Sequence, residues 1–201
     1  MDSSDQATTV CPPRRPPRRP TLPLLVLPKV PNVVSYLPPP VSGPSEILPG
    51  LFLGDRSDAA NASHAFTCIV NCTADLPNSH EDKGTIYLRL PMNDHAGQDI
   101  EQYFDVAFDF IDKALARGEK VLVHCFAGIS RSASIILYYT MKTKRMTLND
   151  AFAFVKARRH IISPNFGFMG TLYHFERTMP NVVAFPAPAH SPVTSPRLAV
   201  M

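Results

Sequence analysis

The segment His124-Cys-Phe-Ala-Gly-Ile-Ser-Arg-Ser132 decides how this chain is expected to fold and to act. It begins at the end of the apolar run 120–124, which predicts a buried strand, and it leads into the apolar run 132–141, which predicts a helix. Such a strand is typical of an α/β sheet, and α/β proteins bind ligands at the carboxyl ends of their strands. Cys125 and Arg131 are therefore expected at a ligand-binding edge.

The spacing within this segment suits a tetrahedral oxyanion. Gly128 permits a backbone conformation that a Cβ would penalise, so that successive backbone N–H groups can turn toward one centre in front of the following helix. Arg131 can hold two oxygens through its planar guanidinium group. The same positive field should lower the pKa of the Cys125 thiol below its usual ~8.5, and Ser132 can donate its hydroxyl to the thiolate.

Two alternatives explain parts of this segment. A buried structural cysteine would explain Cys125 alone, but not the whole array between a strand and a helix. A sulfur-transfer loop shares the spacing from Cys125 to Arg131, but it does not require Gly128 or Ser132. We therefore predict a nucleophilic cysteine in a phosphate-binding loop.

Short apolar runs alternate with helical patterns in the rest of the body. Strands are predicted at 46–54, as a pair around a Pro-Gly turn, and at 67–71 and 85–90. Helices are predicted at 100–115, 147–159 and 165–178. This alternation implies an α/β sheet covered by helices. Arg158, Arg159 and His160 are expected at a solvated helix end, with contact to an acidic substrate as the alternative.

The 21 prolines of the 201 residues divide the chain into parts. Thirteen lie in residues 1–50 and five in residues 180–201, so that two proline-rich tails, 1–44 and 181–201, are predicted to be disordered around a folded body at 45–180. A net charge of +3 and the absence of a long apolar run argue against nucleic acid and against a membrane span. Four irregularly spaced cysteines favour a reduced cytoplasmic or nuclear location.

The loop residues match a known signature. His124-Cys125-x-x-Gly128-x-x-Arg131-Ser132 resembles the signature of cysteine-dependent protein tyrosine phosphatases, and Ala127-Gly-Ile-Ser-Arg-Ser-Ala133 is similar to the dual-specificity phosphatases. The resemblance runs from about Ile47 through Leu51-Phe-Leu-Gly54 and Cys68-Ile-Val-Asn71 to Ser163-Pro-Asn-Phe-Gly-Phe-Met-Gly170. The last segment is similar to MAP kinase phosphatase catalytic domains. It implies a central five-stranded sheet flanked by helices, a cysteinyl-phosphate intermediate, and neither a metal nor another cofactor. Because the proline-rich tail is too short for a separate kinase-binding domain, the chain resembles the small, atypical members.

The resemblance also assigns roles to residues. Asp94 matches the general acid, and Asp99 is the alternative, although it stands where a helix N-cap is expected. His124 is expected to support the loop, and Asn165 either to brace it or to cap the last helix. The catalytic set is thus Cys125, Arg131, Asp94 and Ser132, with the phosphate bound by Phe126, Ala127, Gly128, Ile129, Ser130 and Arg131.

The absent residue types narrow the expected substrate. The chain has no Trp, so it lacks the Trp-Pro-Asp loop of tyrosine-specific relatives. No Lys stands in the loop, whose Phe126, Ala127, Ile129 and Ser130 are neutral, and this favours phosphoproteins over inositol lipids. We expect hydrolysis of phosphotyrosine and of phosphoserine or phosphothreonine. The alternatives are a phosphate-binding scaffold, or a phosphatase of an RNA end or a lipid.

Three further predictions concern partners and redox control. Arg18, Arg19, Leu22 and Leu24 fit a MAP kinase docking peptide, and residues 13–20 fit an SH3 ligand of the polyproline II type. The sheet implied by the resemblance places the strand ending at residue 71 beside the strand ending at residue 124. Cys72 is therefore the predicted disulfide partner of an oxidised Cys125, the alternative being a small buried residue at a strand end.

Overall fold

The computed structural model describes residues 41–180, whereas segments 1–40 and 181–201 lie outside the described residues. Five short strands form one sheet in the order β1-β2-β5-β3-β4. β1 pairs with β2 antiparallel, and the other neighbours are parallel. The strands are β1 (Ser45–Leu48), β2 (Leu51–Gly54), β3 (Cys68–Asn71), β4 (Ile86–Arg89) and β5 (Val121–His124). The predicted five-stranded α/β sheet is therefore confirmed.

The central strand β5 is buried on both faces, as its unbroken apolar run predicts. Val121 and Val123 lie in the main core together with side chains of the long helices. Because neighbouring side chains of a strand point to opposite faces, Leu122 packs on the other face, with Ile69 of β3 and Ala59. Cys125 directly follows the end of β5 and is itself buried in the main core.

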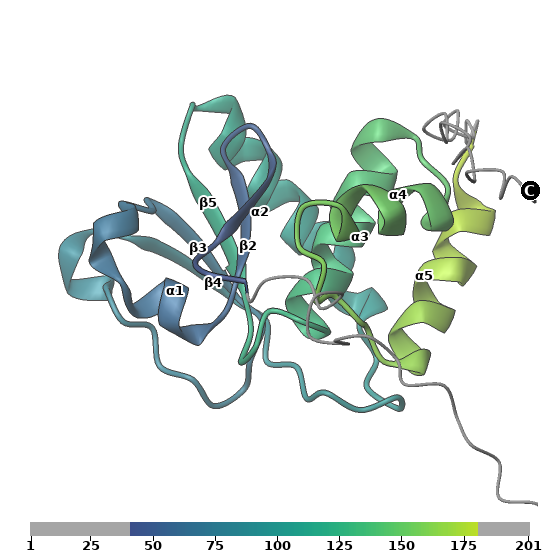
Figure 1. Cartoon of the computed structure of the whole chain (residues 1–201), viewed down its shortest axis with the longest axis horizontal. Helices are drawn as coiled ribbons and strands as arrows, with labels where there is room; N and C mark the ends of the chain where they lie inside the picture. Colours follow the sequence, from purple (N-terminus) through teal and green to yellow (C-terminus); the bar gives the residue numbers. More distant parts are fainter. Residues whose placement is uncertain (1–40, 181–201) are drawn as a thin grey trace, which may run out of the picture. The chain divides into compact units, whose positions relative to one another are not determined.

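Five helices cover the sheet (Figure 1). Helix α3 lies between the sheet and the pair α4 and α5, and residues 132–141 of α3 are all buried. The helices are α1 (Arg56–Ala60), α2 (Phe104–Ala116), α3 (Arg131–Lys144), α4 (Leu148–Lys156) and α5 (Phe166–Thr178), and the 3-10 turns are η2 (Ala62–His64), η3 (Glu81–Lys83) and η4 (Glu101–Tyr103).

Two local features differ from the prediction. Helix α1 was not predicted; it is held by a reciprocal cap in which Asp55 accepts the N–H of Asp58, while the Asp58 carboxylate accepts the N–H of Asp55. The expectation that Arg159 belongs to a solvated helix end is wrong. Arg159 follows the end of α4 and is only 2% exposed, because its guanidinium group turns inward to backbone carbonyls.

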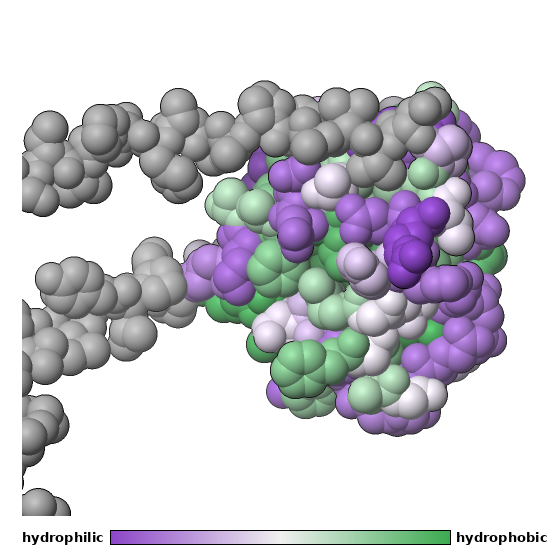
Figure 2. Space-filling view, turned by 90° about the vertical axis from the view of Figure 1, so that its right-hand side faces the viewer, coloured by the Kyte–Doolittle hydropathy of each residue, from purple (hydrophilic) through white to green (hydrophobic). Residues whose placement is uncertain are grey.

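Helix α5 is amphipathic. Phe168 and Leu172 are fully buried, whereas Phe166 is 94% exposed and Tyr173 is 57% exposed. Figure 2 faces the side of α4 and α5 and shows hydrophobic residues among polar ones. Within residues 41–180, no helix is both long and apolar enough to cross a membrane.

Candidate active site

The loop between β5 and α3 starts at Cys125 and ends at Arg131, the first residue of α3. Its nucleophile candidate, Cys125, is 2% exposed. Gly128 has φ +66°, a conformation that disfavours side chains. A Cβ at Gly128 would also lie 2.6 Å from the carbonyl oxygen of Gly54, the last residue of β2. Both observations explain why glycine stands there.

The loop carbonyls are held from outside the loop. The carbonyl oxygen of Phe126 accepts the N–H of Arg56 (3.3 Å), and that of Ile129 accepts the N–H of Ser163 (2.9 Å). The C=O and N–H of a trans peptide point in opposite directions, and the described residues contain no cis peptide. The N–H groups of Ala127 and Ser130 therefore point toward the opposite side, where they can converge on an anion.

Cys125 differs from the other described cysteines in its acidity. Burial raises the pKa of Cys68 to about 11, and it raises the pKa of Cys72 well above the usual value. Burial also acts to raise the pKa of Cys125, but hydrogen bonds from the hydroxyl and N–H of Ser132 and from the N–H of Gly128 outweigh it, and Arg131 adds to them. The net pKa of Cys125 is lowered. The Ser132 hydroxyl lies 3.1 Å from the Cys125 sulfur.

Arg131 lies near the Cys125 thiol and has an unused hydrogen-bond donor. Its Nη1 donates to the carbonyl oxygen of Met92 (3.3 Å). Its buried Nε has no hydrogen-bond acceptor in the described part of the chain, since the Asp94 Oδ2 lies 3.6 Å away. A planar guanidinium group in this position can donate two hydrogen bonds to one phosphate.

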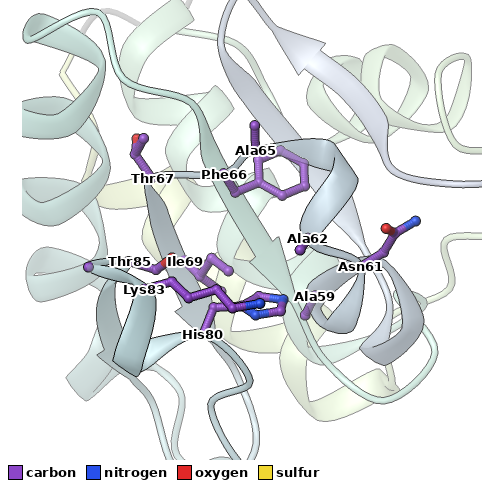
Figure 3. Close-up of a pocket in the computed structure, with 11 residues that line it drawn as sticks. Ala59, Asn61, Ala62, Ala65, Phe66, Thr67, Ile69, His80, Lys83 and Thr85 are labelled. Atoms are coloured by element: carbon purple, nitrogen blue, oxygen red, sulfur yellow. The ribbon is translucent and has the colours of Figure 1, made fainter.

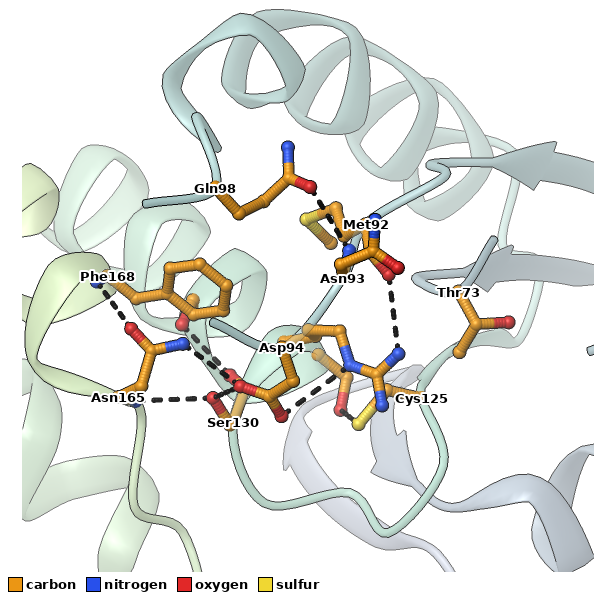
Figure 4. A network of polar contacts seen from close by, with 12 residues as sticks. Thr73, Met92, Asn93, Asp94, Gln98, Cys125, Ser130, Asn165 and Phe168 are labelled. Atoms are coloured by element: carbon orange, nitrogen blue, oxygen red, sulfur yellow. Dashed lines mark hydrogen bonds and ion pairs between the residues drawn. The ribbon is translucent and has the colours of Figure 1, made fainter. Parts of the chain in front are cut away.

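Asp94 is held at the loop by two residues, Ser130 and Asn165, from segments far from it in sequence (Figure 4). The hydroxyl of Ser130 donates to its Oδ1 (2.7 Å), and the Asn165 side-chain amide donates to the same oxygen (2.9 Å). The backbone N–H of Asn165 in turn donates to the Ser130 hydroxyl (3.2 Å). Asn165 also caps α5, because its Oδ1 accepts the N–H of Phe168. The Asn165 side chain therefore caps α5 and holds Asp94, whereas the contact with the loop residue Ser130 is made by the Asn165 backbone.

The alternative acid, Asp99, contacts the backbone at the start of η4. Its Oδ1 accepts the N–H of Glu101, the first residue of η4 (3.0 Å). His95 is exposed, and its Nδ1 accepts the N–H of Gly97. Among the described residues, neither side chain forms a hydrogen bond or ion pair with the loop, whereas Asp94 contacts Ser130 and Arg131 directly.

His124 is 2% exposed, and burial lowers its pKa to about 4. Its Nδ1 lies 3.3 Å from the carbonyl oxygen of Cys125. An imidazole that stays neutral at physiological pH fits a support for the loop better than a proton carrier.

Cys72 directly follows β3, and Cys125 directly follows the neighbouring strand β5. Asn71 of β3 is paired with His124 of β5, and the N–H of Cys72 donates to the carbonyl oxygen of His124 (2.9 Å). Both thiols are free and buried. Their neighbouring strand ends keep the predicted disulfide sterically feasible.

We expect Cys72 to rescue Cys125 from peroxide. Oxidation of the Cys125 thiolate gives a sulfenic acid, and the Cys72 thiol then displaces water to form a disulfide that dithiothreitol reduces. The wild type should regain most of its activity after mild peroxide and dithiothreitol, whereas Cys72→Ser should regain roughly a third or less, because sulfinic acid forms irreversibly. Cys68→Ser is the matched control, since Cys68 is equally buried on β3 but donates to Glu119. Equal recovery in Cys72→Ser and Cys68→Ser would contradict the prediction.

Two contributors to the site were not predicted from the sequence. Ser130 was expected only to bind phosphate through the loop, but its hydroxyl links Asp94 to Asn165. Arg159 was expected in solvent, but its Nε donates to the carbonyl oxygen of Gly128 (3.0 Å). No local sequence pattern predicts either contact, because the partners are 31 to 36 residues apart in sequence.

A pocket of about 260 Å³ lies elsewhere, on the α1 face of the sheet (Figure 3). Ala59, Phe66, Ile69, His80 and Lys83 are among the residues that line it. It contains none of the loop residues, so it is separate from the site of Cys125. Within residues 41–180, no group of three His, Cys, Asp or Glu side chains is placed to hold a metal ion.

Residues 51–178 match the family described as the dual specificity phosphatase catalytic domain. Human dual specificity protein phosphatase 9 is 44% identical over 151 residues, which cover 71% of this chain and 39% of that protein. The matched part thus spans about two fifths of that curated relative.

Two solved structures share the fold. The human tyrosine phosphatase-like serine/threonine/tyrosine-interacting protein is 38% identical with a TM-score of 0.62, and the match covers 67% of this chain and 96% of that chain. A mouse putative dual specificity phosphatase, solved as a complex with zinc tungstate, is 30% identical with a TM-score of 0.63, and the match covers 71% and 90% of the two chains.

Proposed function

Because this chain belongs to the dual specificity phosphatase family, we propose that it hydrolyses phosphotyrosine and phosphoserine or phosphothreonine in proteins through a cysteinyl-phosphate intermediate. The observation that carries the proposal is the placement of the buried Cys125 sulfur beside the Ser132 hydroxyl, in a loop whose carbonyls are held outward and which ends at Arg131. This combination supplies a nucleophile and an oxyanion site in one place.

The proposed first step transfers the phosphoryl group to sulfur. The loop N–H groups and Arg131 bind the phosphate oxygens, and the Cys125 thiolate attacks phosphorus as the bond to the substrate oxygen breaks. Asp94 donates a proton to that oxygen, which leaves as the phenol or alcohol of the dephosphorylated protein.

The proposed second step returns the enzyme to its starting state. Asp94, now a carboxylate, takes a proton from a water molecule that attacks phosphorus. The sulfur–phosphorus bond breaks, inorganic phosphate leaves, and the Ser132 hydroxyl stabilises the departing thiolate.

A phosphate-binding scaffold is the second candidate, because one structural relative is named only as phosphatase-like. The simultaneous presence of Cys125, Arg131 and Asp94 favours the enzyme. Release of inorganic phosphate from tyrosine- and threonine-phosphorylated peptides tests the proposal. A protein that binds tungstate but releases no phosphate from either peptide would contradict it and favour the scaffold.

MAP kinases are the proposed substrates, on the strength of the resemblance of residues 163–170 to MAP kinase phosphatases. The predicted docking residues Arg18, Arg19, Leu22 and Leu24 and the SH3 ligand at 13–20 lie outside the described residues and stay predictions. A cytoplasmic or nuclear location is likewise proposed from the cysteine usage.

The rim of the loop suggests a preference for acidic substrates. The Arg56 guanidinium lies 4.0 Å from the ring centroid of Phe126, which is 47% exposed, and no acidic side chain of residues 41–180 forms an ion pair with it. We expect Arg56→Ala to lower kcat/KM about two- to fivefold for a phosphopeptide with Glu next to the phosphoresidue, the scale of one exposed ion pair. Turnover of para-nitrophenyl phosphate should not change.

The control for this prediction is Arg158→Ala. Arg158 is also exposed and stacks on an aromatic ring, that of Phe154 at 3.6 Å, but it contacts no loop residue. The preference for Glu over Ala in the peptide should shrink in Arg56→Ala alone. An unchanged preference in both variants would refute the role of Arg56.

A further inference from the structure

Arg159 is a buried cation in the protein interior. It is 2% exposed, and no carboxylate within residues 41–180 lies at ion-pair distance from it. Burial acts to lower its pKa, whereas the charges of Asp58, Asp55 and Cys125 oppose this shift. Because an arginine stays charged in proteins, burying one is unfavourable unless its donors are well used.

Within residues 41–180, the three side-chain hydrogen bonds of Arg159 go to neutral oxygens of two other segments. Nε donates to the carbonyl oxygen of Gly128 (3.0 Å). Nη1 donates to the carbonyl oxygen of Gly43 (3.3 Å) and to the hydroxyl of Ser45 (3.4 Å), at the start of β1. The guanidinium group thus ties the middle of the catalytic loop to the edge of the sheet.

Gly128 is confined between this guanidinium group and the end of β2. A Cβ at Gly128 would lie 2.5 Å from Arg159 Nη2 and 2.6 Å from the carbonyl oxygen of Gly54. Since the peptide is trans, holding the Gly128 carbonyl toward Arg159 turns the N–H of Ile129 toward the opposite side, the side of the anion.

Arg159 differs in kind from the other outer contacts of the loop. The carbonyls of Phe126 and Ile129 are held by backbone N–H groups, which any residue at those positions would supply. The carbonyl of Gly128 is held by a charged side chain. A second positively charged group, in addition to Arg131, is thereby hydrogen-bonded to the loop that follows Cys125.

We propose that Arg159 is a positioning residue of the catalytic loop, which orients the peptide between Gly128 and Ile129 toward the phosphate and favours the thiolate of Cys125 by its charge. Of this inference, only the expected loss of kcat/KM rests on the proposed phosphatase function. The orientation of the loop and the state of the thiol can be measured without turnover.

The test compares Arg159→Met, Arg159→Lys and the exposed neighbour Arg158→Ala in the full chain. Three quantities are measured: the pH midpoint of Cys125 alkylation by iodoacetamide, the dissociation constant of tungstate, and kcat/KM for para-nitrophenyl phosphate. We expect Arg159→Met to raise the alkylation midpoint by roughly one pH unit, and to weaken tungstate binding and kcat/KM about 10- to 100-fold. For all three quantities, Arg159→Lys should give values between those of the wild type and Arg159→Met, because lysine keeps the positive charge but not the planar fork of donors.

A purely structural role predicts a different result. Thermal unfolding would then shift to lower temperature in Arg159→Met, while the alkylation midpoint and tungstate affinity of the folded protein stayed at wild-type values, and this overturns the proposal. If Arg159→Met does not fold, Arg159→Lys decides by the same criteria. If the wild type binds tungstate but turns nothing over, the proposed function fails, and the first two measurements still decide the role of Arg159.

Discussion

Cys125→Ser is expected to lower the turnover of para-nitrophenyl phosphate by roughly 10⁴-fold or more, which is the scale of loss when a covalent nucleophile is removed. A serine hydroxyl beside Arg131 remains protonated and attacks phosphorus poorly. Tungstate binding should persist, because the loop N–H groups and Arg131 are unchanged and the negative thiolate is gone. The variant should therefore retain phosphorylated partners in a pull-down, and this retention would identify the substrate.

Cys72→Ser provides the matched control, because it makes the same substitution at a buried cysteine that follows the neighbouring strand. In the absence of peroxide its turnover should stay within about twofold of the wild type, as expected for a residue that takes no part in the reaction. Comparable losses in Cys125→Ser and Cys72→Ser would indicate that both act through folding, and the nucleophile would have to be sought elsewhere.

The pH dependence follows from the direction of the Cys125 pKa. The pKa is lowered, so the thiolate persists below the pH at which an ordinary cysteine becomes protonated. As pH falls through this lowered pKa, kcat/KM should drop tenfold per pH unit, and the rate of alkylation of Cys125 should drop with the same midpoint. The two midpoints should agree because both report one group in the free enzyme.

The features that follow from short sequence patterns could be predicted. The apolar run before His124, the glycine between Cys125 and Arg131, and the apolar run after Ser132 define the strand, the loop and the helix within one stretch of sequence. Side-chain periodicity likewise located all five strands and the four long helices within a few residues. These elements depend on local spacing and on burial, which a sequence displays.

The contacts that complete the site could not be predicted, because they join segments far apart in sequence. Arg159 stands between Arg158 and His160, and such a basic run is typical of a solvated helix end. Only the packed structure brings Arg159 to Gly43 and Gly128, which are 116 and 31 residues away in sequence. The Ser130 hydroxyl similarly meets Asp94 across 36 residues. Helix α1 was missed for a local reason, since its cap uses Asp55 and Asp58 in place of the usual Ser or Thr followed by Glu.

Replacing Asp94 should have the second-largest effect, and the structure indicates how to separate its chemistry from its placement. Ser130 and Asn165 hold its Oδ1, so Oδ2, the oxygen nearer to Arg131, is the one able to face a phosphate ester bound there. Asp94→Asn keeps a carbonyl oxygen for both donors but removes the acidic proton. We expect kcat to fall about 10²- to 10³-fold for phenyl phosphate.

The dependence on the leaving group tests the role of Asp94 as the general acid. The loss in Asp94→Asn should be smaller for para-nitrophenyl phosphate, because its leaving group needs little protonation. Asp99→Asn is the control, because Asp99 is exposed and, among the described residues, its carboxylate accepts only the nearby N–H of Glu101 and the side-chain amide of Gln102, and its kcat should stay within about twofold of the wild type. A loss in Asp94→Asn that is equal for both esters would show that Asp94 positions the loop, since a residue that protonates the leaving oxygen must matter most where that oxygen leaves least readily.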